Sequence, residues 1–186
     1  MAHATKMAAE ASQTPDVFRT QLRDNAAQIT ALAAAIKQKD PEFVYMIGRG
    51  TSDHAGVFGK YLIETELGLP VAAAAPSVNS VFGKSLRLQK ALVFVISQSG
   101  RSPDILAQAK MAKEKGALVV ALVNDESSPL ADLADFFVPL KAGPEVAVAA
   151  TKSYLASLYA LLTIVAACSD NQALREALSA LPDRLD

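Results

Sequence analysis

Three serine side chains cluster in the segment Ser97-Gln-Ser-Gly-Arg-Ser102, directly after an apolar and largely β-branched run. That run, residues 91–96, is typical of a strand buried on both faces. Ser102 followed by Pro103 is typical of the N-cap and first residue of a helix. Hydroxyls beside the free N–H groups of a helix N-terminus can bind a phosphate. The segment has no lysine and matches neither the Walker motif nor G-x-G-x-x-G, which favours a sugar phosphate over a nucleoside triphosphate.

An ordinary turn is the alternative interpretation of this segment, because Ser-Gly loops are common turns. Its position favours a binding site, since open α/β sheets bind ligands at the carboxyl ends of their strands. Two further polar loops follow apolar segments. One is Gly48-Arg-Gly-Thr-Ser52, and the other begins at residues 142–145 and leads into 148–152. In a parallel sheet all three loops would converge on one edge.

Apolar segments alternate with helical patterns along the chain, which positions these loops. We expect strands at 43–47, 70–75, 91–96, 117–123 and 136–140. We expect helices at 14–39, 52–67, 103–116 and 148–168, and shorter helical segments within 76–85, at 129–134 and after 171. The alternation predicts an α/β fold, a three-layer α/β/α sandwich around a five-stranded parallel sheet of the flavodoxin-like or Rossmann-like kind.

Composition narrows the class of protein. The 186 residues suffice for one domain, and the formal net charge of −1 shows no basic excess for a nucleic acid. The single Cys168 excludes an internal disulfide and, with two histidines, argues against zinc. Residues 1–12 lack the apolar core of a signal peptide, and the apolar run 154–168 is shorter than the roughly 20 residues of a membrane span. We therefore expect a cytoplasmic protein without a membrane or nucleic-acid partner.

Three motifs, in this order, resemble those of the SIS (sugar isomerase) phosphosugar-binding domain. They are Gly-Thr-Ser at 50–52, Ser-Gln-Ser-Gly-x-Ser at 97–102 and Ala-Gly-x-Glu-x-x-Val-Ala-x-Thr-Lys at 142–152. The chain is most similar to the first of two such domains in glutamine–fructose-6-phosphate aminotransferases, and is similar to aminosugar-phosphate isomerases and deaminases. It departs from the aminotransferases at Arg49, where they commonly carry a small residue or cysteine, and at Ala150, which replaces their serine.

The resemblance implies roles for the matching positions. The phosphate would be held by Ser52, Ser97, Ser99 and Ser102. The sugar would lie against Gly50, Thr51, Gln98, Val148, Ala149, Thr151 and Lys152. No cofactor and no metal are expected.

Several of these polar positions also have a structural interpretation. Gly50 could only permit a tight turn, and Arg101 and Lys152 could be solvated surface charges. Glu145 could order its own loop through backbone hydrogen bonds. For His54 an ordinary polar contact is favoured over a catalytic role.

The implied activity is aldose–ketose isomerisation of fructose 6-phosphate or glucosamine 6-phosphate, linked to transfer or release of ammonia. Isomerisation needs a base, and in two-domain relatives the base glutamate and the ring-opening histidine lie in the second domain. This chain shows no counterpart, so it is expected to be an N-terminal half that is inactive alone. Alternatives are a single-domain isomerase with its site between subunits, a non-catalytic phosphosugar sensor, and a Rossmann nucleotide binder, although residues 72–75 lack that fold's acidic residue.

The expected organisation has three parts. Residues 1–40 form an N-terminal helix that packs on the domain, 41–168 form the SIS domain, and 169–186 form a helical segment leading toward an absent second SIS domain. The helix at 148–168 is apolar on nearly every side. It would leave an exposed patch, so we expect a homodimer or a higher homo-oligomer.

Overall fold

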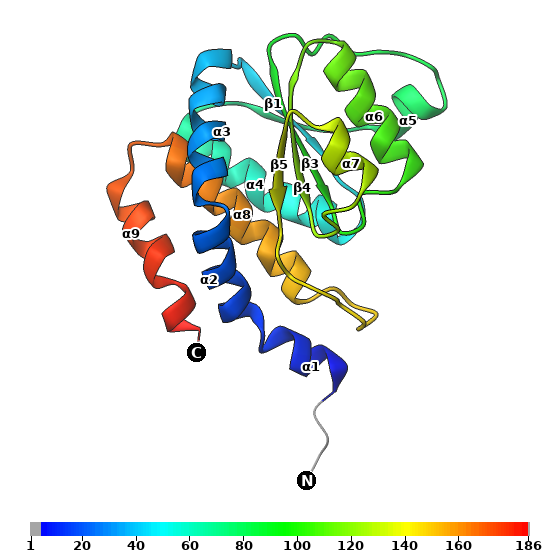
Figure 1. Cartoon of the computed structure of the whole chain (residues 1–186). Helices are drawn as coiled ribbons and strands as arrows, with labels where there is room; N and C mark the ends of the chain where they lie inside the picture. The colour runs from blue at the N-terminus through cyan, green and yellow to red at the C-terminus, as the bar shows by residue number, and fades with distance from the viewer. Residues whose placement is uncertain (1–4, 186) are drawn as a thin grey trace.

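Five parallel strands form the centre of the computed structural model, which describes residues 5–185 (Figure 1). They are β1 (Phe43–Ile47), β2 (Val71–Ala73), β3 (Ala91–Ser97), β4 (Leu118–Val123) and β5 (Phe136–Pro139). Their order is β2-β1-β3-β4-β5, the order of flavodoxin-like folds. Ile47 of β1 is in register with Val95 of β3, which is in register with Ala121 of β4. The predicted fold class is confirmed.

Helices cover both faces of the sheet because each inner strand is apolar on both sides. Val44, Phe94 and Leu122 belong to the core under α2 (Thr14–Asp24), α3 (Ala26–Lys39), α4 (Thr51–Leu67) and α8 (Lys152–Cys168). Tyr45 and Val93 belong to the opposite core, under α6 (Pro103–Glu114) and α7 (Pro129–Leu133). The short α5 (Pro76–Ser80) lies beside α6 (Figure 1). The molecule is therefore a three-layer sandwich.

The single helix expected at 14–39 is wrong, because the chain bends at Asn25. The structure has α2 (Thr14–Asp24) and α3 (Ala26–Lys39), preceded by α1 (Lys6–Ala11). The buried Asn25 side chain donates its amide N–H to the carbonyl of Pro139 at 2.9 Å, which ties the bend to the end of β5. Residues 1–4 and 186, at the ends of the expected terminal segments, lie outside the described residues.

Helix α8 begins at Lys152, four residues later than expected, because residues 148–151 belong to the preceding loop. The exposed apolar patch expected on α8 is also wrong. Helices α2, α3, α4 and α9 (Gln172–Ala180) pack around it, and none of the large exposed apolar side chains belongs to it. Phe18 stacks on Tyr159 with ring centroids 4.0 Å apart. A one-turn 3₁₀ helix, η1 (Pro182–Arg184), follows α9 and contacts α2.

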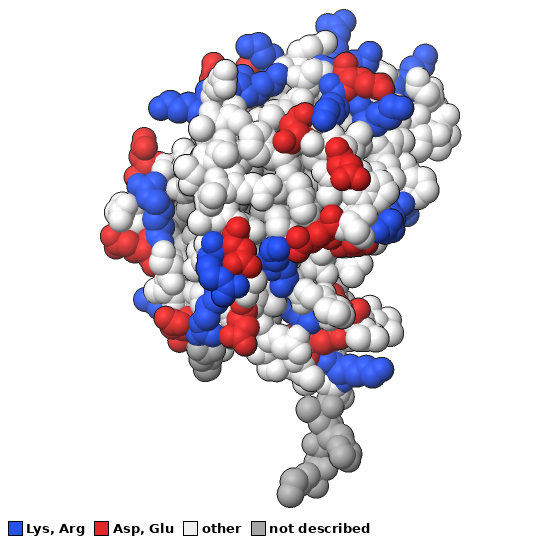
Figure 2. All heavy atoms as spheres, in the orientation of Figure 1, with Lys and Arg blue, Asp and Glu red and all other residues white. Residues whose placement is uncertain are grey.

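Positive and negative side chains are interspersed on the face shown in Figure 2, in keeping with the near-zero net charge. Over residues 5–185, the helices are all too short or too polar to cross a lipid bilayer.

Candidate functional site

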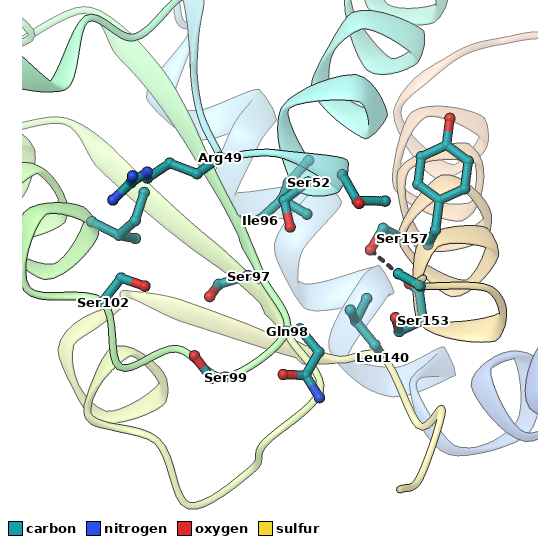
Figure 3. Close-up of a pocket in the computed structure, with 14 residues that line it drawn as sticks. Arg49, Ser52, Ile96, Ser97, Gln98, Ser99, Ser102, Leu140, Ser153 and Ser157 are labelled. Carbon is teal, nitrogen blue, oxygen red and sulfur yellow. Dashed lines mark hydrogen bonds between the residues drawn. The ribbon is translucent and has the colours of Figure 1, made fainter. Parts of the chain in front are cut away.

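A cavity of about 280 Å³ opens at the carboxyl ends of β1 and β3. From β1 the chain continues to β2 on one side, and the next strand, β3, lies on the other. Doubly wound sheets bind their ligands at such a switch point. Figure 3 shows side chains from three segments around this space: the β1–α4 loop, the β3–α6 loop and α8. The sheet thus brings together two of the predicted polar loops, and the third reaches the cavity through Ala150.

The serines at the end of β3 and in the loop that leads to α6 differ in how their hydroxyls are hydrogen-bonded. The Ser97 hydroxyl is buried and accepts the Gly100 N–H at 2.9 Å, so it closes the turn. Among residues 5–185, the Ser99 hydroxyl accepts one hydrogen bond, from the Arg101 N–H at a long 3.4 Å. Ser102 is the N-cap of α6, as predicted, yet its side chain makes no capping hydrogen bond. The hydroxyls of Ser99 and Ser102 therefore keep most of their hydrogen-bonding capacity for a ligand.

The turn in this loop requires glycine at position 100. Gly100 has a φ of +62°, in the left-handed region. A Cβ added there would lie 2.6 Å from the Cβ of Ser128 and 2.9 Å from Cγ1 of Val123. The buried Ser128 is itself fixed, because its hydroxyl caps α7 by accepting the Ala131 N–H. The path of the loop is thus set by packing against the next strand and helix.

The β1–α4 loop supplies Arg49, and the first turn of α4 supplies Thr51 and Ser52. Gly50 is the N-cap of α4 with a φ of +55°, and it does not line the cavity. Nη1 of Arg49 lies 3.0 Å from Oδ2 of Asp104, in the first turn of α6. This ion pair joins the starts of the two helices on either side of the cavity.

The β5–α8 loop is organised by two carboxylates. Glu145 accepts the N–H groups of Thr151 at 3.0 Å and Ser153 at 3.1 Å, and also both of their hydroxyls. Burial raises the pKa of Glu145, but the hydrogen bonds from Ser153 and Thr151 outweigh it, so the pKa lies below its ordinary value. Glu145 is therefore an ionised group that orders its loop through backbone hydrogen bonds, as one interpretation of the sequence predicted.

The second carboxylate comes from the N-terminal helix α1. The buried Glu10 accepts the N–H groups of Val146 at 2.5 Å and of Ala147 at 3.1 Å. Nearby, Nζ of Lys152 donates to Oε1 of Gln13 at 2.6 Å. Lys152 is buried, so it is not the solvated surface charge that was one interpretation of it.

The predicted site residues divide into two groups. The four predicted phosphate ligands line the cavity, as do two of the predicted sugar contacts: Ser52, Ser97, Ser99 and Ser102, with Thr51 and Gln98. The other predicted sugar contacts do not line it: Gly50, Val148, Ala149, Thr151 and Lys152. For all of them, contact with a ligand stays a prediction. Two further residues lie outside the lining: the exposed His54, and Arg101, whose guanidinium pairs with Asp125.

Helix α8 contributes a wall of the cavity that was not predicted from the sequence. Ser153, Tyr154 and Ser157 line the cavity, and the Ser157 hydroxyl donates to the carbonyl of Ser153 at 2.9 Å (Figure 3). The available signal was a pair of hydroxyls four residues apart, hence on one face, in an otherwise apolar helix. Among the described residues that line the cavity, Arg49 is the only one with a formal charge at neutral pH.

Comparison with known proteins identifies the family of this chain. The family profile described as "SIS domain" matches residues 38–167. A glutamine–fructose-6-phosphate aminotransferase (isomerizing) from Caldanaerobacter subterraneus subsp. tengcongensis is 36% identical over 164 residues, 85% of this chain and 27% of the relative. The corresponding enzyme from Bacillus subtilis is 37% identical over 139 residues, 75% of this chain and 23% of the relative.

Two solved structures extend the comparison. A "putative phosphosugar isomerase" from Silicibacter pomeroyi superposes with a TM-score of 0.94 at 42% identity, over 98% of this chain and 56% of that one. The C-terminal domain of a glucosamine-fructose-6-phosphate aminotransferase from Francisella tularensis has a TM-score of 0.75 at 22% identity, which shows a shared fold; it is matched over 99% of this chain and 54% of that one. This chain thus spans about a quarter of the curated aminotransferases and about half of either structure. With a profile match over most of its length, the chain belongs to the SIS-domain family.

Proposed function

We propose that this chain binds a sugar 6-phosphate, of the fructose 6-phosphate or glucosamine 6-phosphate class, in the cavity at the ends of β1 and β3. The observation that carries the proposal is the group of serine hydroxyls there, Ser52, Ser97, Ser99 and Ser102, beside the first turns of α4 and α6. Neutral donors and helix N-termini of this kind favour a phosphate. The names of the relatives support the same ligand class.

We propose further that the bound sugar is the substrate of an aldose–ketose isomerase, of aminotransferase or deaminase type, to which this chain contributes the N-terminal half. Isomerisation needs a group that can move a proton. The described residues that line the cavity include no carboxylate and no imidazole. Glu145, the acidic residue closest in sequence to the lining residue Ala150, is engaged by its own loop. The base would therefore come from outside this chain.

In this proposal residues 41–168 are the phosphosugar-binding unit, and the described residues of the terminal segments 1–40 and 169–186 pack on it. We also propose a cytoplasmic homo-oligomer. The single cysteine supports the location, and two exposed apolar side chains one turn apart on α4, Val57 and Tyr61, support an interface.

A non-catalytic phosphosugar sensor is the second candidate function. The same observation favours it, because a cavity without a proton-transferring side chain can bind a ligand without reacting with it. The two functions share the ligand and differ in turnover when the whole protein is assayed.

Isothermal titration calorimetry of the chain with fructose 6-phosphate, glucosamine 6-phosphate and free fructose tests the proposal. We expect the phosphorylated sugars to bind and free fructose to bind far more weakly, because the anion supplies most of the interaction. Equal affinity for fructose and its 6-phosphate would contradict a phosphate-directed site.

A further inference from the structure

Arg49, the charged residue of the cavity wall, has guanidinium N–H groups that are available to a ligand. Within residues 5–185 its one hydrogen bond is donated from Nη1 to Asp104, and its side chain is 65% exposed. A guanidinium carries five N–H donors in a planar fork that matches phosphate oxygens. The group can therefore reach a second anion without first breaking a complete set of contacts.

The position of this guanidinium is at the phosphate end of the proposed site. Its partner Asp104 is the second residue of α6, and Ser102 is the N-cap of the same helix. Figure 3 shows the Arg49 side chain extending from the end of β1 toward the side of the cavity on which Ser102 lies. The opposite wall, formed by α8, carries Ser153 and Ser157.

Arg101 comes from the serine loop itself but is not equivalent. Its Nε donates to Asp125 at 3.0 Å, and its Nη2 donates to the carbonyl and hydroxyl oxygens of Ser127, each at 3.1 Å. It does not line the cavity. Lys152 is likewise committed to Gln13. Of these three cations, Arg49 is the one placed to meet a ligand.

The carboxylate of Asp104 repels an incoming anion, whereas the guanidinium of Arg49 attracts it. The carboxylate lies in the first turn of α6, two residues after Ser102, and is 22% exposed, so it is only partly screened by water. In the ligand-free protein it is neutralised by Arg49. When a phosphate dianion enters, the two anions compete for one guanidinium.

We propose that Arg49 is a phosphate-binding residue of this chain and that Asp104 competes with the ligand for it. This inference rests on the proposed function. Arg49 then adds a positive charge to a cradle otherwise built from neutral hydroxyls and backbone groups. This charge increases the preference for a dianionic phosphate over a neutral sugar.

Calorimetric titration with fructose 6-phosphate tests this inference through Arg49→Gln, Arg49→Lys and Asp104→Asn. We expect Arg49→Gln to weaken binding about tenfold, in line with the loss of one charge-assisted hydrogen bond, and Arg49→Lys to fall between it and wild type. Asp104→Asn is expected to tighten binding about threefold, because the competing charge is gone while Arg49 remains. Inorganic phosphate alone should follow the same order.

Arg87→Gln is the matched control, because it removes the same charge from an exposed residue outside the cavity and should leave affinity within about twofold. Thermal melting without ligand checks that each variant is folded. If wild type binds and Arg49→Gln binds equally well, the role of Arg49 is overturned while the proposed function stands. If Asp104→Asn binds more weakly than wild type, the competition is overturned. A wild-type chain that binds no sugar phosphate overturns both proposals.

Discussion

The serines of the β3–α6 loop have separable roles, although the sequence presents them as one motif. Ser97 is held inside the turn by the Gly100 N–H, whereas Ser102 caps α6 by position only. A hydroxyl used by the fold contributes to stability in the ligand-free protein. A hydroxyl without such a partner contributes only when a ligand is present. This difference can be measured one residue at a time.

Replacing Ser102 with alanine should weaken binding of fructose 6-phosphate by about 1–3 kcal/mol, because a hydrogen bond to a charged oxygen is lost. The melting temperature should change little. Ser97→Ala is the matched comparison and should lower both affinity and melting temperature, since the Gly100 N–H loses its partner. Calorimetry and thermal melting of both variants would contradict this division if Ser102→Ala proved the less stable protein.

Gly100→Ala should destabilise the fold and abolish binding. Alanine at a φ of +62° is strained by about 1–2 kcal/mol, and its Cβ would also meet Ser128 and Val123. Gly68→Ala is the control, because Gly68 has a similar φ of +67° but open space around the added atom. Urea unfolding of the two variants should give the larger loss for Gly100→Ala. Equal losses would mean that only backbone strain matters at position 100.

At the scale of elements, the β5–α8 loop is held from both sides, by Glu145 within it and by Glu10 from α1. Residues 146 and 147 donate their N–H groups to Glu10, and residues 151 and 153 donate theirs to Glu145. The N-terminal helix therefore contributes to the order of a loop that carries Ala150 into the cavity wall.

Glu10→Ala should release this loop, because two backbone N–H groups lose a buried acceptor. We expect a loss of about 1–3 kcal/mol in the free energy of unfolding and faster amide hydrogen exchange at Val146 and Ala147. Glu114→Ala is the control, since Glu114 is exposed and pairs with Lys110 on its own helix. Unchanged exchange at Val146 in Glu10→Ala would show that α1 does not hold the loop.

The contribution of Glu145 should depend on pH. Its pKa is lowered in the folded chain, so its stabilising effect is full above the ordinary value of about 4.5 and is lost as pH falls through the folded pKa. Urea unfolding of wild type and Glu145→Gln between about pH 3 and pH 7 measures this. The gap between the two proteins should shrink below pH 4.5. A gap that widens on acidification would mean that the carboxyl group stabilises the loop in its protonated form.

Local signals in the sequence were enough to predict most of the helices and strands. The strands were predictable because the uninterrupted apolar runs 91–96 and 118–123 are typical of strands that are buried on both faces. The caps at Ser128 and Gly68 were predictable from residue type alone. The bend at Asn25 was not, because it depends on a hydrogen bond to Pro139, over a hundred residues away.

The same difference between local signals and long-range contacts explains which residues of the site were not predicted. The serines near the ends of β1 and β3 were predictable because each comes shortly after an apolar run that is typical of a strand. The hydroxyls of Ser153 and Ser157 lie in a helix whose composition indicates only burial, and their role depends on how α8 crosses the sheet. The start of α8 likewise depends on the carboxylate of Glu145. Such contacts are set by the fold rather than by neighbouring residues.

At the scale of the whole molecule, α8 connects the terminal segments to the site. Its buried face packs against α2, α3 and α9, while its first turns line the cavity. Tyr159 stacks on Phe18 of α2 and donates its hydroxyl to the carbonyl of Leu178 in α9, and burial raises its pKa to about 12. The helices before β1 and after α8 therefore stabilise the wall on which the ligand would rest.

The 186-residue chain assayed alone should show no isomerase activity on fructose 6-phosphate or glucosamine 6-phosphate. The reason is the absence of a carboxylate or imidazole among the described residues that line the cavity. A coupled assay at saturating substrate measures this, with a full-length relative as the positive control. Turnover that Glu145→Gln abolishes would show that the chain carries its own base and is a complete enzyme.

A phosphorylated sugar should bind at the carboxyl ends of β1 and β3. Titration of ¹⁵N-labelled protein with fructose 6-phosphate, followed by amide NMR, locates the binding site along the chain. We expect saturable shift changes concentrated in residues 49–53, 97–104 and 150–157, and no comparable changes with free fructose. Saturable changes confined to other parts of the chain, or equal changes with fructose, would contradict this prediction.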